Sequence, residues 1–228
     1  MKTPFVVLLG LLLAGAGAAA SAAEVTLEGN HLVVTGMLDG SAMKAFTEHL
    51  ASGKVRTVVF ENSLGGTAEV AGDYARAIQA TGVNTEARGQ CYAACAYAFL
   101  AGKEHRFGRG FQINGLLIPI GTRPQPGELT NRWRGDGAQK TLAEFITAPA
   151  SADGPQPTAA AVAAVAAVPA SAPKERWQPD HGVLFTSTPT LFGRVYNSFY
   201  CDGTQGRDMS RCEVLSDADP YKLGVLSP

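Results

Sequence analysis

The sequence predicts an α/β fold with a parallel sheet, and three observations support this prediction. Short runs rich in β-branched apolar residues alternate with segments whose apolar residues recur at helical spacing. These helical segments are about 10 to 15 residues long, the length that connects parallel strands. The composition is that of a folded chain, since 46% of its 228 residues are hydrophobic and 17% are charged.

The expected elements follow one another in a regular order. A strand pair turns at Gly29-Asn30, and the next segment carries Met43, Phe46 and Leu50 on one helical face. A turn at residues 63–66 separates a buried strand from a second helix. We expect strands at 25–35 (a pair), 55–60, 83–87, 111–120, 183–186 and 194–200, and helices at 42–50, 68–81 and 91–100.

The first 23 residues have the form of a secretory signal peptide. Lys2 is followed by an apolar run over 5–13 and by small residues that end at Ala23. The apolar run is shorter than the roughly 20 residues that span a bilayer. We therefore expect cleavage and a periplasmic or secreted protein without a stable membrane span. The small-residue tail lengthens the non-polar stretch, which leaves an uncleaved anchor as the alternative.

A segment of biased composition divides the rest of the chain. From Ala148 to Pro173 it is almost wholly Ala, Pro, Val, Ser and Gly. Its prolines favour a tether, whereas the Ala/Val block at 159–168 suits a three-turn helix. The predicted organisation is a signal peptide at 1–23, an α/β domain at 24–147, a linker at 148–175 and a C-terminal extension at 176–228.

The charge argues against two classes of partner. Lys and Arg number 19 and Asp and Glu number 20, which gives a formal net charge of -1 without a sustained basic run. Such a chain lacks the electrostatic footprint of a protein that binds the phosphate backbone of a nucleic acid or an anionic bilayer. We expect neither a nucleic-acid partner nor a cofactor.

Four cysteines in an oxidising compartment indicate disulfides, and four cysteines allow three pairings. Local pairing is the prediction. Cys201 and Cys212 close a short loop that contains turn residues, where a bridge adds roughly 3 kcal/mol of stability. Cys91 and Cys95 suit a bridge at a strand-to-helix turn better than inside a regular helix. Neither spacing is usual for zinc ligands and no histidine is close, so we expect no metal.

Three stretches, in this order and at this spacing, resemble the periplasmic branch of the ClpP protease/crotonase superfamily: 58–66, 89–96 and 99–102. In that superfamily an apolar strand runs into a Ser-x-Gly-Gly turn, and a C-x-S-A-C type motif follows at a later helix start. The resemblance covers residues 24–119 and implies a spiral of repeated β-β-α units. Residues 199–226 resemble the stapled C-terminal hairpin of some members, which implies a disulfide-stapled, β-rich extension.

The resemblance also implies an oxyanion hole made of backbone N–H groups, from Gly65 or Gly66 and from Ala94. The position of the nucleophilic serine is occupied by Ala93, which has no hydroxyl. The position of the histidine base corresponds to Asn114, whose amide does not titrate near pH 7. Both substitutions indicate a pseudoenzyme.

The other residues that could act as the nucleophile in place of Ala93 are better explained by structural roles. Ser63 before Gly-Gly is expected to form the turn, and Cys91 and Cys95 are expected to be oxidised or buried. The sequence contains four histidines, the residues whose imidazole could serve as a general base. We expect His49 and His105 at the solvated surface, and His31 and His181 have no assigned role.

The crotonase branch of the superfamily acts on acyl-CoA and needs acidic residues near its oxyanion hole. Glu61, Glu69 and Asp73 are the nearest carboxylates in the sequence. Helix capping and solvation are the commoner roles at such positions. Acyl-CoA is also not expected outside the cytoplasm, so this branch is disfavoured.

Aromatic residues of the second half have two possible uses. They form either a binding face or part of the core, and core packing is the commoner use. The residues concerned are Trp133, Trp177, Phe192, Tyr196, Phe199 and Tyr200.

The sequence therefore predicts an exported ClpP/crotonase-like domain that is catalytically inactive and serves as a binding or assembly module, with a peptide or protein ligand. The alternative is an active periplasmic serine-type peptidase or hydrolase with a non-standard nucleophile. A third interpretation is a structural subunit that uses the fold for oligomerisation. A homo-oligomer is implied by the resemblance.

Overall fold

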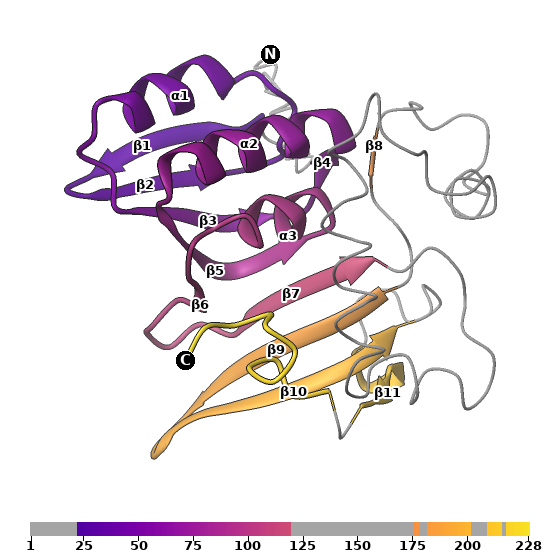
Figure 1. Ribbon diagram of the computed structural model, residues 1–228. Helices are drawn as coiled ribbons and strands as arrows, with labels where there is room; N and C mark the ends of the chain where they lie inside the picture. The colour runs from indigo at the N-terminus through magenta and orange to yellow at the C-terminus, as the bar shows by residue number, and fades with distance from the viewer. Residues whose placement is uncertain (1–21, 120–175, 178–181, 202–208, 216–217) are drawn as a thin grey trace, which may run out of the picture.

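Within the part of the chain that the structure describes, nine strands form one mixed β-sheet, and three helices lie on a single face of it (Figure 1). The computed structural model describes residues 22–119, 176–177, 182–201, 209–215 and 218–228. The sheet has the order β1-β2-β3-β5-β7-β9-β10-β11, and β6 pairs with β5. Its strands are β1 (Glu24–Glu28), β2 (His31–Thr35), β3 (Thr57–Ser63), β5 (Asn84–Tyr92), β6 (His105–Phe107), β7 (Asn114–Pro119), β9 (Gly182–Thr190), β10 (Gly193–Cys201) and β11 (Glu213–Val214).

The centre of the sheet is parallel and its two sides are antiparallel. Strands β2, β3, β5 and β7 run parallel to one another. At one side β1 turns back onto β2, and at the other β9 pairs antiparallel with β7. The predicted α/β class with parallel pairing is confirmed. The C-terminal extension continues the same sheet, so it adds its strands to the core.

The helices are α1 (Met43–Ala51), α2 (Ala68–Thr81) and α3 (Ala94–Phe99). Helix α2 has the predicted bounds because Thr67 accepts a hydrogen bond from the N–H of Val70 at its start and Gly82 ends it with φ 62°. Helix α3 begins three residues later than predicted, since Cys91 and Tyr92 continue β5 and pair with β7. In a continuous apolar run, periodicity cannot distinguish a buried strand from a buried helix.

The core lies between the helices and the sheet. Phe46 of α1 and Tyr74 of α2 are fully buried, with ring centroids 4.5 Å apart, and Phe60 of β3 lies 6.5 Å from the ring of Tyr74. Burial raises the pKa of Tyr74 to about 12, and the charge of Asp39 adds to this effect. Tyr74 is therefore a neutral core residue. In each strand, the residues that alternate with those facing the helices point to the opposite face of the sheet.

Both predicted local disulfides are present. Cys91 is bonded to Cys95, and Cys201 is bonded to Cys212. The second bond ties the end of β10 to the segment after the short 3-10 helix at Met209–Arg211.

Several predictions fall outside the described residues: the signal peptide up to residue 21, the linker at 148–175, Trp133 and His181. Among the residues that are described, no helix is long and apolar enough to cross a membrane. Over the same residues no group of three or more His, Cys, Asp and Glu side chains is placed to hold a metal ion.

The prediction of a solvated His105 is wrong. The residue begins β6, and its half-buried imidazole packs 5.7 Å from the ring of Phe99. Its N–H donates to the hydroxyl of Ser227 at 2.9 Å, and its C=O accepts from the N–H of Ser227 at 2.7 Å. Burial lowers the pKa of His105 below 6.5, and backbone hydrogen bonds partly oppose this shift.

This shift predicts a loss of stability in mild acid. The unfolded chain takes up a proton on His105 before the folded protein does, so the free energy of unfolding falls as the pH drops below 6.5. Thermal unfolding of the wild type and of His105→Gln, measured from about pH 8 to about pH 5, should show a smaller decrease in Tm for the variant. His49→Gln at the end of α1 is the matched control. Equal slopes for the wild type and His105→Gln would contradict the prediction.

Candidate functional site

The connection between β5 and α3 is a sharp strand-to-helix turn at Ala93. This residue has φ 50° and ψ -107°, and its side chain is 1% exposed. Such a backbone costs about 1–3 kcal/mol and persists where the surrounding structure enforces it. Hydrolases place their nucleophile on a turn of this kind. In this chain the turn carries a methyl group.

Neighbouring contacts fix the backbone of Ala93. Its N–H donates to the C=O of Leu117 on β7 at 3.0 Å, and its C=O accepts from the N–H of Tyr97 at 3.0 Å. The disulfide between Cys91 and Cys95 joins β5 to the first turn of α3 across the same residue. Because both sulfurs are in this bond, neither cysteine is available as a thiolate nucleophile.

The glycine turn predicted to form part of the oxyanion hole packs against the backbone of Leu38. The N–H of Leu38 donates to the C=O of Gly65 at 2.9 Å, and the C=O of Leu38 accepts from the N–H of Thr67 at 3.2 Å. A Cβ atom on Gly66 would lie 2.2 Å from the carbonyl oxygen of Leu38, so glycine is required by this close approach. The N–H and C=O of Gly66 consequently face away from Leu38.

The backbone edge on the side away from Leu38 belongs to β4 (Gly66–Thr67), and it is paired with another segment of the chain. Strand β8 (Arg176–Trp177) runs antiparallel to it, with Gly66 opposite Trp177 (Figure 1). Strand β4 is also in contact with α3. The structure thus brings together the elements that carry Gly66 and Ala94. Ala94 is the first residue of α3, where backbone N–H groups have no partner within the helix.

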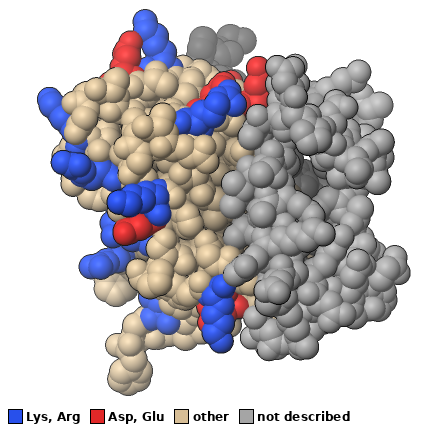
Figure 2. All heavy atoms as spheres, in the orientation of Figure 1, with Lys and Arg blue, Asp and Glu red and all other residues tan. Residues whose placement is uncertain are grey.

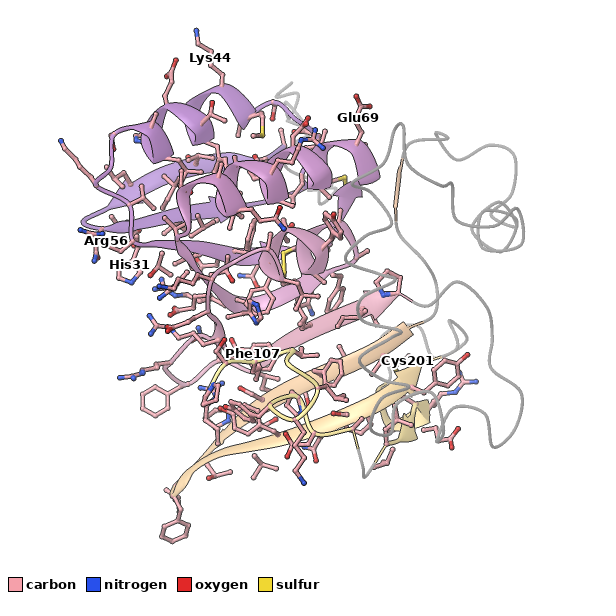
Figure 3. All side chains as sticks on the ribbon, in the orientation of Figure 1. His31, Lys44, Arg56, Glu69, Phe107 and Cys201 are labelled. Atoms are coloured by element: carbon pink, nitrogen blue, oxygen red, sulfur yellow. A yellow bond between two sulfur atoms is a disulfide. The ribbon has the colours of Figure 1, made fainter. Side chains whose placement is uncertain are left out.

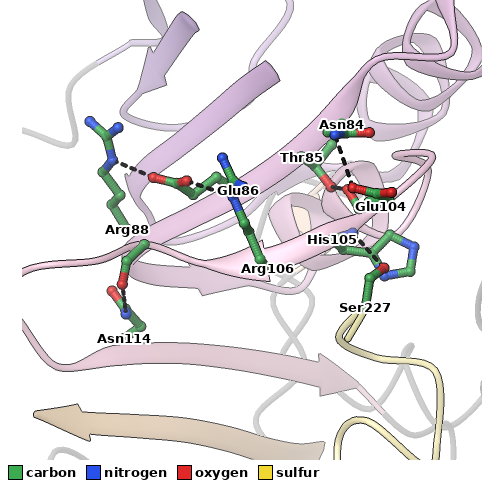
Figure 4. A network of polar contacts seen from close by, with 10 residues as sticks. Asn84, Thr85, Glu86, Arg88, Glu104, His105, Arg106, Asn114 and Ser227 are labelled. Atoms are coloured by element: carbon green, nitrogen blue, oxygen red, sulfur yellow. Dashed lines mark hydrogen bonds and ion pairs between the residues drawn. The ribbon is translucent and has the colours of Figure 1, made fainter. Parts of the chain in front are cut away.

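Asn114, the expected counterpart of a catalytic histidine, lies away from this turn. Its buried amide accepts a hydrogen bond from the N–H of Gly89 at 2.9 Å and donates to the C=O of Gly108 at 2.9 Å (Figure 4). The register of β5 and β7 places Asn114 level with Gly89, four residues before Ala93. At about 3.3 Å per residue this is roughly 13 Å along the strand. The structure does not bring Asn114 and Ala93 together.

The residue of β7 beside the turn is Leu117, which pairs with Tyr92 and accepts the hydrogen bond of Ala93. An aliphatic side chain has no group that can take a proton. Burial raises the pKa of Tyr92 and of Tyr97, so both phenols are neutral at pH 7. Sequence reasoning missed Leu117 because it sought a polar residue, and only the strand register identifies this position.

The remaining residues that the sequence offers as catalytic candidates differ in how deeply their side chains are buried. Ser63 pairs with Cys91 across the sheet, and its buried hydroxyl has no hydrogen-bond partner among the described residues. Glu69 stands in the first turn of α2, and Asp73 forms an ion pair with Arg76 on the surface of that helix. Glu61 follows Phe60 on β3 and so points to the face of the sheet opposite the helices.

The aromatic residues of the extension divide between core and surface. Tyr200 is buried, and Phe199 packs on the disulfide formed by Cys201. Tyr196 stacks on Phe107 with ring centroids 6.4 Å apart. Phe192 differs from these residues because its side chain is 99% exposed.

No protein-family model and no curated protein sequence matches the chain. Solved structures resemble part of it. A probable enoyl-CoA hydratase/isomerase from Mycobacterium abscessus has 13% identity, covers 43% of this chain and 49% of its own, and has a TM-score of 0.31. A membrane-bound stomatin-specific protease has 16% identity, covers 50% of this chain and 67% of its own, and has a TM-score of 0.34.

An enoyl-CoA hydratase from Mycobacterium avium subsp. paratuberculosis K-10 has 15% identity and a TM-score of 0.33, and the match covers 55% of this chain and 56% of that one. The chain thus spans about half to two thirds of the length of these structures. No activity of this chain follows from likenesses of this extent.

Replacing Ala93 by glycine should stabilise the fold by about 1 kcal/mol, because glycine adopts positive φ without strain. The loss of one buried methyl group and the greater freedom of glycine in the unfolded chain offset part of the relieved strain. Chemical denaturation of both proteins measures the difference in the free energy of unfolding. The matched control is Ala98→Gly inside α3, which should lose about 1 kcal/mol or more. A similar loss for Ala93→Gly would show that the turn is not strained.

Proposed function

We propose that this chain is an exported, non-catalytic binding module with a ClpP/crotonase-like fold, and that it binds an extended peptide segment. The observation that carries the proposal is the turn at Ala93. It has the backbone of a nucleophile-bearing turn, and its side chain is a methyl group. A methyl group has no lone pair to attack a carbonyl carbon.

The residues around Ala93 also support the proposal that the site does not hydrolyse a substrate. Leu117 occupies the neighbouring position on β7, and Tyr92 and Tyr97 are neutral phenols. The nearby cysteines are joined in a disulfide. Without a nucleophile and a base, a site of this kind retains only what backbone donors and binding supply.

The edge of β4 supports the binding of an extended peptide. Peptides add to a strand edge mainly through backbone hydrogen bonds, which require no particular side chain. The edge at Gly66 already accepts an extended segment of the same chain, strand β8. The N–H groups of Gly66 and Ala94 are the donors that would hold a peptide carbonyl there.

The finer features of the proposal have separate support. A spiral of β-β-α units is supported by the order β1-β2-α1 followed by β3-β4-α2. Export to the periplasm or the medium is supported by the two disulfides, which persist in oxidising compartments. A homo-oligomer is proposed from the resemblance of the sequence to the superfamily.

A hydrolase with another nucleophile is the second candidate. The buried hydroxyl of Ser63 favours it, since this group has no hydrogen-bond partner among the described residues and lies beside Cys91. A fully buried hydroxyl would have to become exposed before it met a substrate.

A fluorophosphonate probe separates the two candidates. The wild type should remain unlabelled, and the double variant Ala93→Ser with Leu117→His should be labelled because it places a hydroxyl on the turn and an imidazole on the adjacent strand. Intact-protein mass should show labelling about 10²-fold faster than for Ala93→Ser alone, the usual contribution of a general base. Ala98→Ser with Leu117→His is the control for a hydroxyl away from the turn. Labelling of the wild type at Ser63 would establish the hydrolase instead.

Peptide binding tests the second part of the proposal. A fluorescent peptide with the sequence of residues 173–180 should bind the Trp177→Pro protein about tenfold or more tightly than the wild type, because proline removes an N–H from β8 and frees the edge of β4. Fluorescence anisotropy measures the two Kd values. The same peptide with proline in place of its tryptophan is the control and should bind neither protein. Equal binding of both peptides would exclude strand addition at β4.

A further inference from the structure

Two neighbouring loops present large apolar side chains to water. Phe111, in the loop between β6 and β7, is 97% exposed. Leu191 and Phe192, in the turn between β9 and β10, are 97% and 99% exposed. The end of the β9-β10 hairpin projects beyond the rest of the sheet (Figure 1). Large apolar side chains with this exposure on two neighbouring loops indicate a surface that meets a partner or a membrane.

Arg194 holds these two loops together. From β10, its Nη1 donates to the C=O of Gly110 at 2.9 Å and its Nη2 donates to the C=O of Gln112 at 2.6 Å. Its Nε donates to the hydroxyl of Ser187 at 2.7 Å. These bonds fix the residues on both sides of Phe111 to the hairpin. The apolar tips are therefore carried on a common rigid base.

A cavity rich in arginine adjoins the Phe111 loop. It has a volume of about 510 Å³, and it is lined by Arg88, Arg106 and Arg109, by Gln112, and by Glu61 and Glu86. His31 also lines it, and Figure 3 shows Arg56 beside His31. Arg109 and Gln112 belong to the same loop as Phe111, so this loop carries both the apolar tip and part of the cavity lining.

The buried carboxylate of Glu86 orients two of these arginines. It accepts from the Nε of Arg88 at 2.8 Å and from the Nε of Arg106 at 3.0 Å. The terminal nitrogens of Arg88 point away from this carboxylate (Figure 4). Arg109 forms no hydrogen bond or ion pair with the described residues. Lys and Arg side chains outnumber Asp and Glu along the left edge of the molecule in Figure 2.

We propose that this surface, formed by Phe111, Leu191, Phe192 and the arginines of the cavity, docks the protein onto an anionic phospholipid bilayer. The three apolar tips enter the headgroup region, and the guanidinium groups bind lipid phosphates, whose geometry matches the arginine fork. The three arginines of the cavity outnumber its two carboxylates, and this excess of positive charge favours an anionic bilayer over a second copy of the chain. The tips are single side chains at loop ends, and the cavity beside them is lined mainly by charged and polar residues.

Co-sedimentation of the intact protein with lipid vesicles tests the proposal. The wild type should bind vesicles of phosphatidylglycerol and phosphatidylethanolamine about tenfold or more tightly than vesicles of phosphatidylcholine, and added salt should weaken binding. Phe192→Ser and Phe111→Ser should each reduce the partition coefficient about tenfold, and Arg109→Gln about fivefold.

Matched controls come from exposed residues elsewhere in the molecule. Val214→Ser on β11 and Lys44→Gln on α1 should bind as the wild type does. Absence of wild-type binding to anionic vesicles, or equal binding by the Phe192→Ser variant, would overturn the proposal. A lower mass of Phe192→Ser in sedimentation velocity, with vesicle binding unchanged, would assign the surface to contacts between copies instead.

Discussion

The geometry of the candidate site depends on one constraint, the reversal of the chain at Ala93. Strand β5 is fixed on both sides by parallel pairing with β3 and β7, and α3 is buried along its whole length. One residue therefore has to turn the chain from a central strand into a buried helix. The hydrogen bond from Ala93 to Leu117 and the disulfide between Cys91 and Cys95 hold that residue in a backbone conformation that alanine otherwise avoids.

The sequence was informative where periodicity or residue chemistry is local. The bounds of α2 follow from a Thr cap and a terminal glycine, and both disulfides follow from short separations. It was less informative where pairing is long-range. The predicted start of α3 is three residues too early because Cys91 and Tyr92 belong to an apolar run. The prediction for His105 is wrong because the pairing of β6 with β5 has no local signal in the sequence.

For the candidate site too, the sequence predicts the features that are local in the chain and not those that depend on long-range strand pairing. The motif around Ala93 predicts a turn at a helix start, and Ala93 stands on a sharp turn between strand and helix. The counterpart on β7 requires the register of two strands that are far apart in the chain, and the structure places Leu117 there while Asn114 serves the backbone of Gly89 and Gly108. The pairing of Gly66 with β8 involves a partner more than a hundred residues away, which no local pattern marks.

The two proposed surfaces lie at opposite ends of the parallel strands. The turn at Ala93 and the edge of β4 follow the carboxyl ends of β5 and β3, whereas the loop with Phe111 precedes β7 and the turn with Phe192 lies beyond the level of Asn114. A molecule docked on lipid through Phe111 and Phe192 would therefore direct the edge of β4 away from the bilayer. The two proposals involve different residues, so loss of one activity would leave the other intact, and a peptide held at β4 would be kept at a fixed distance from the lipid surface.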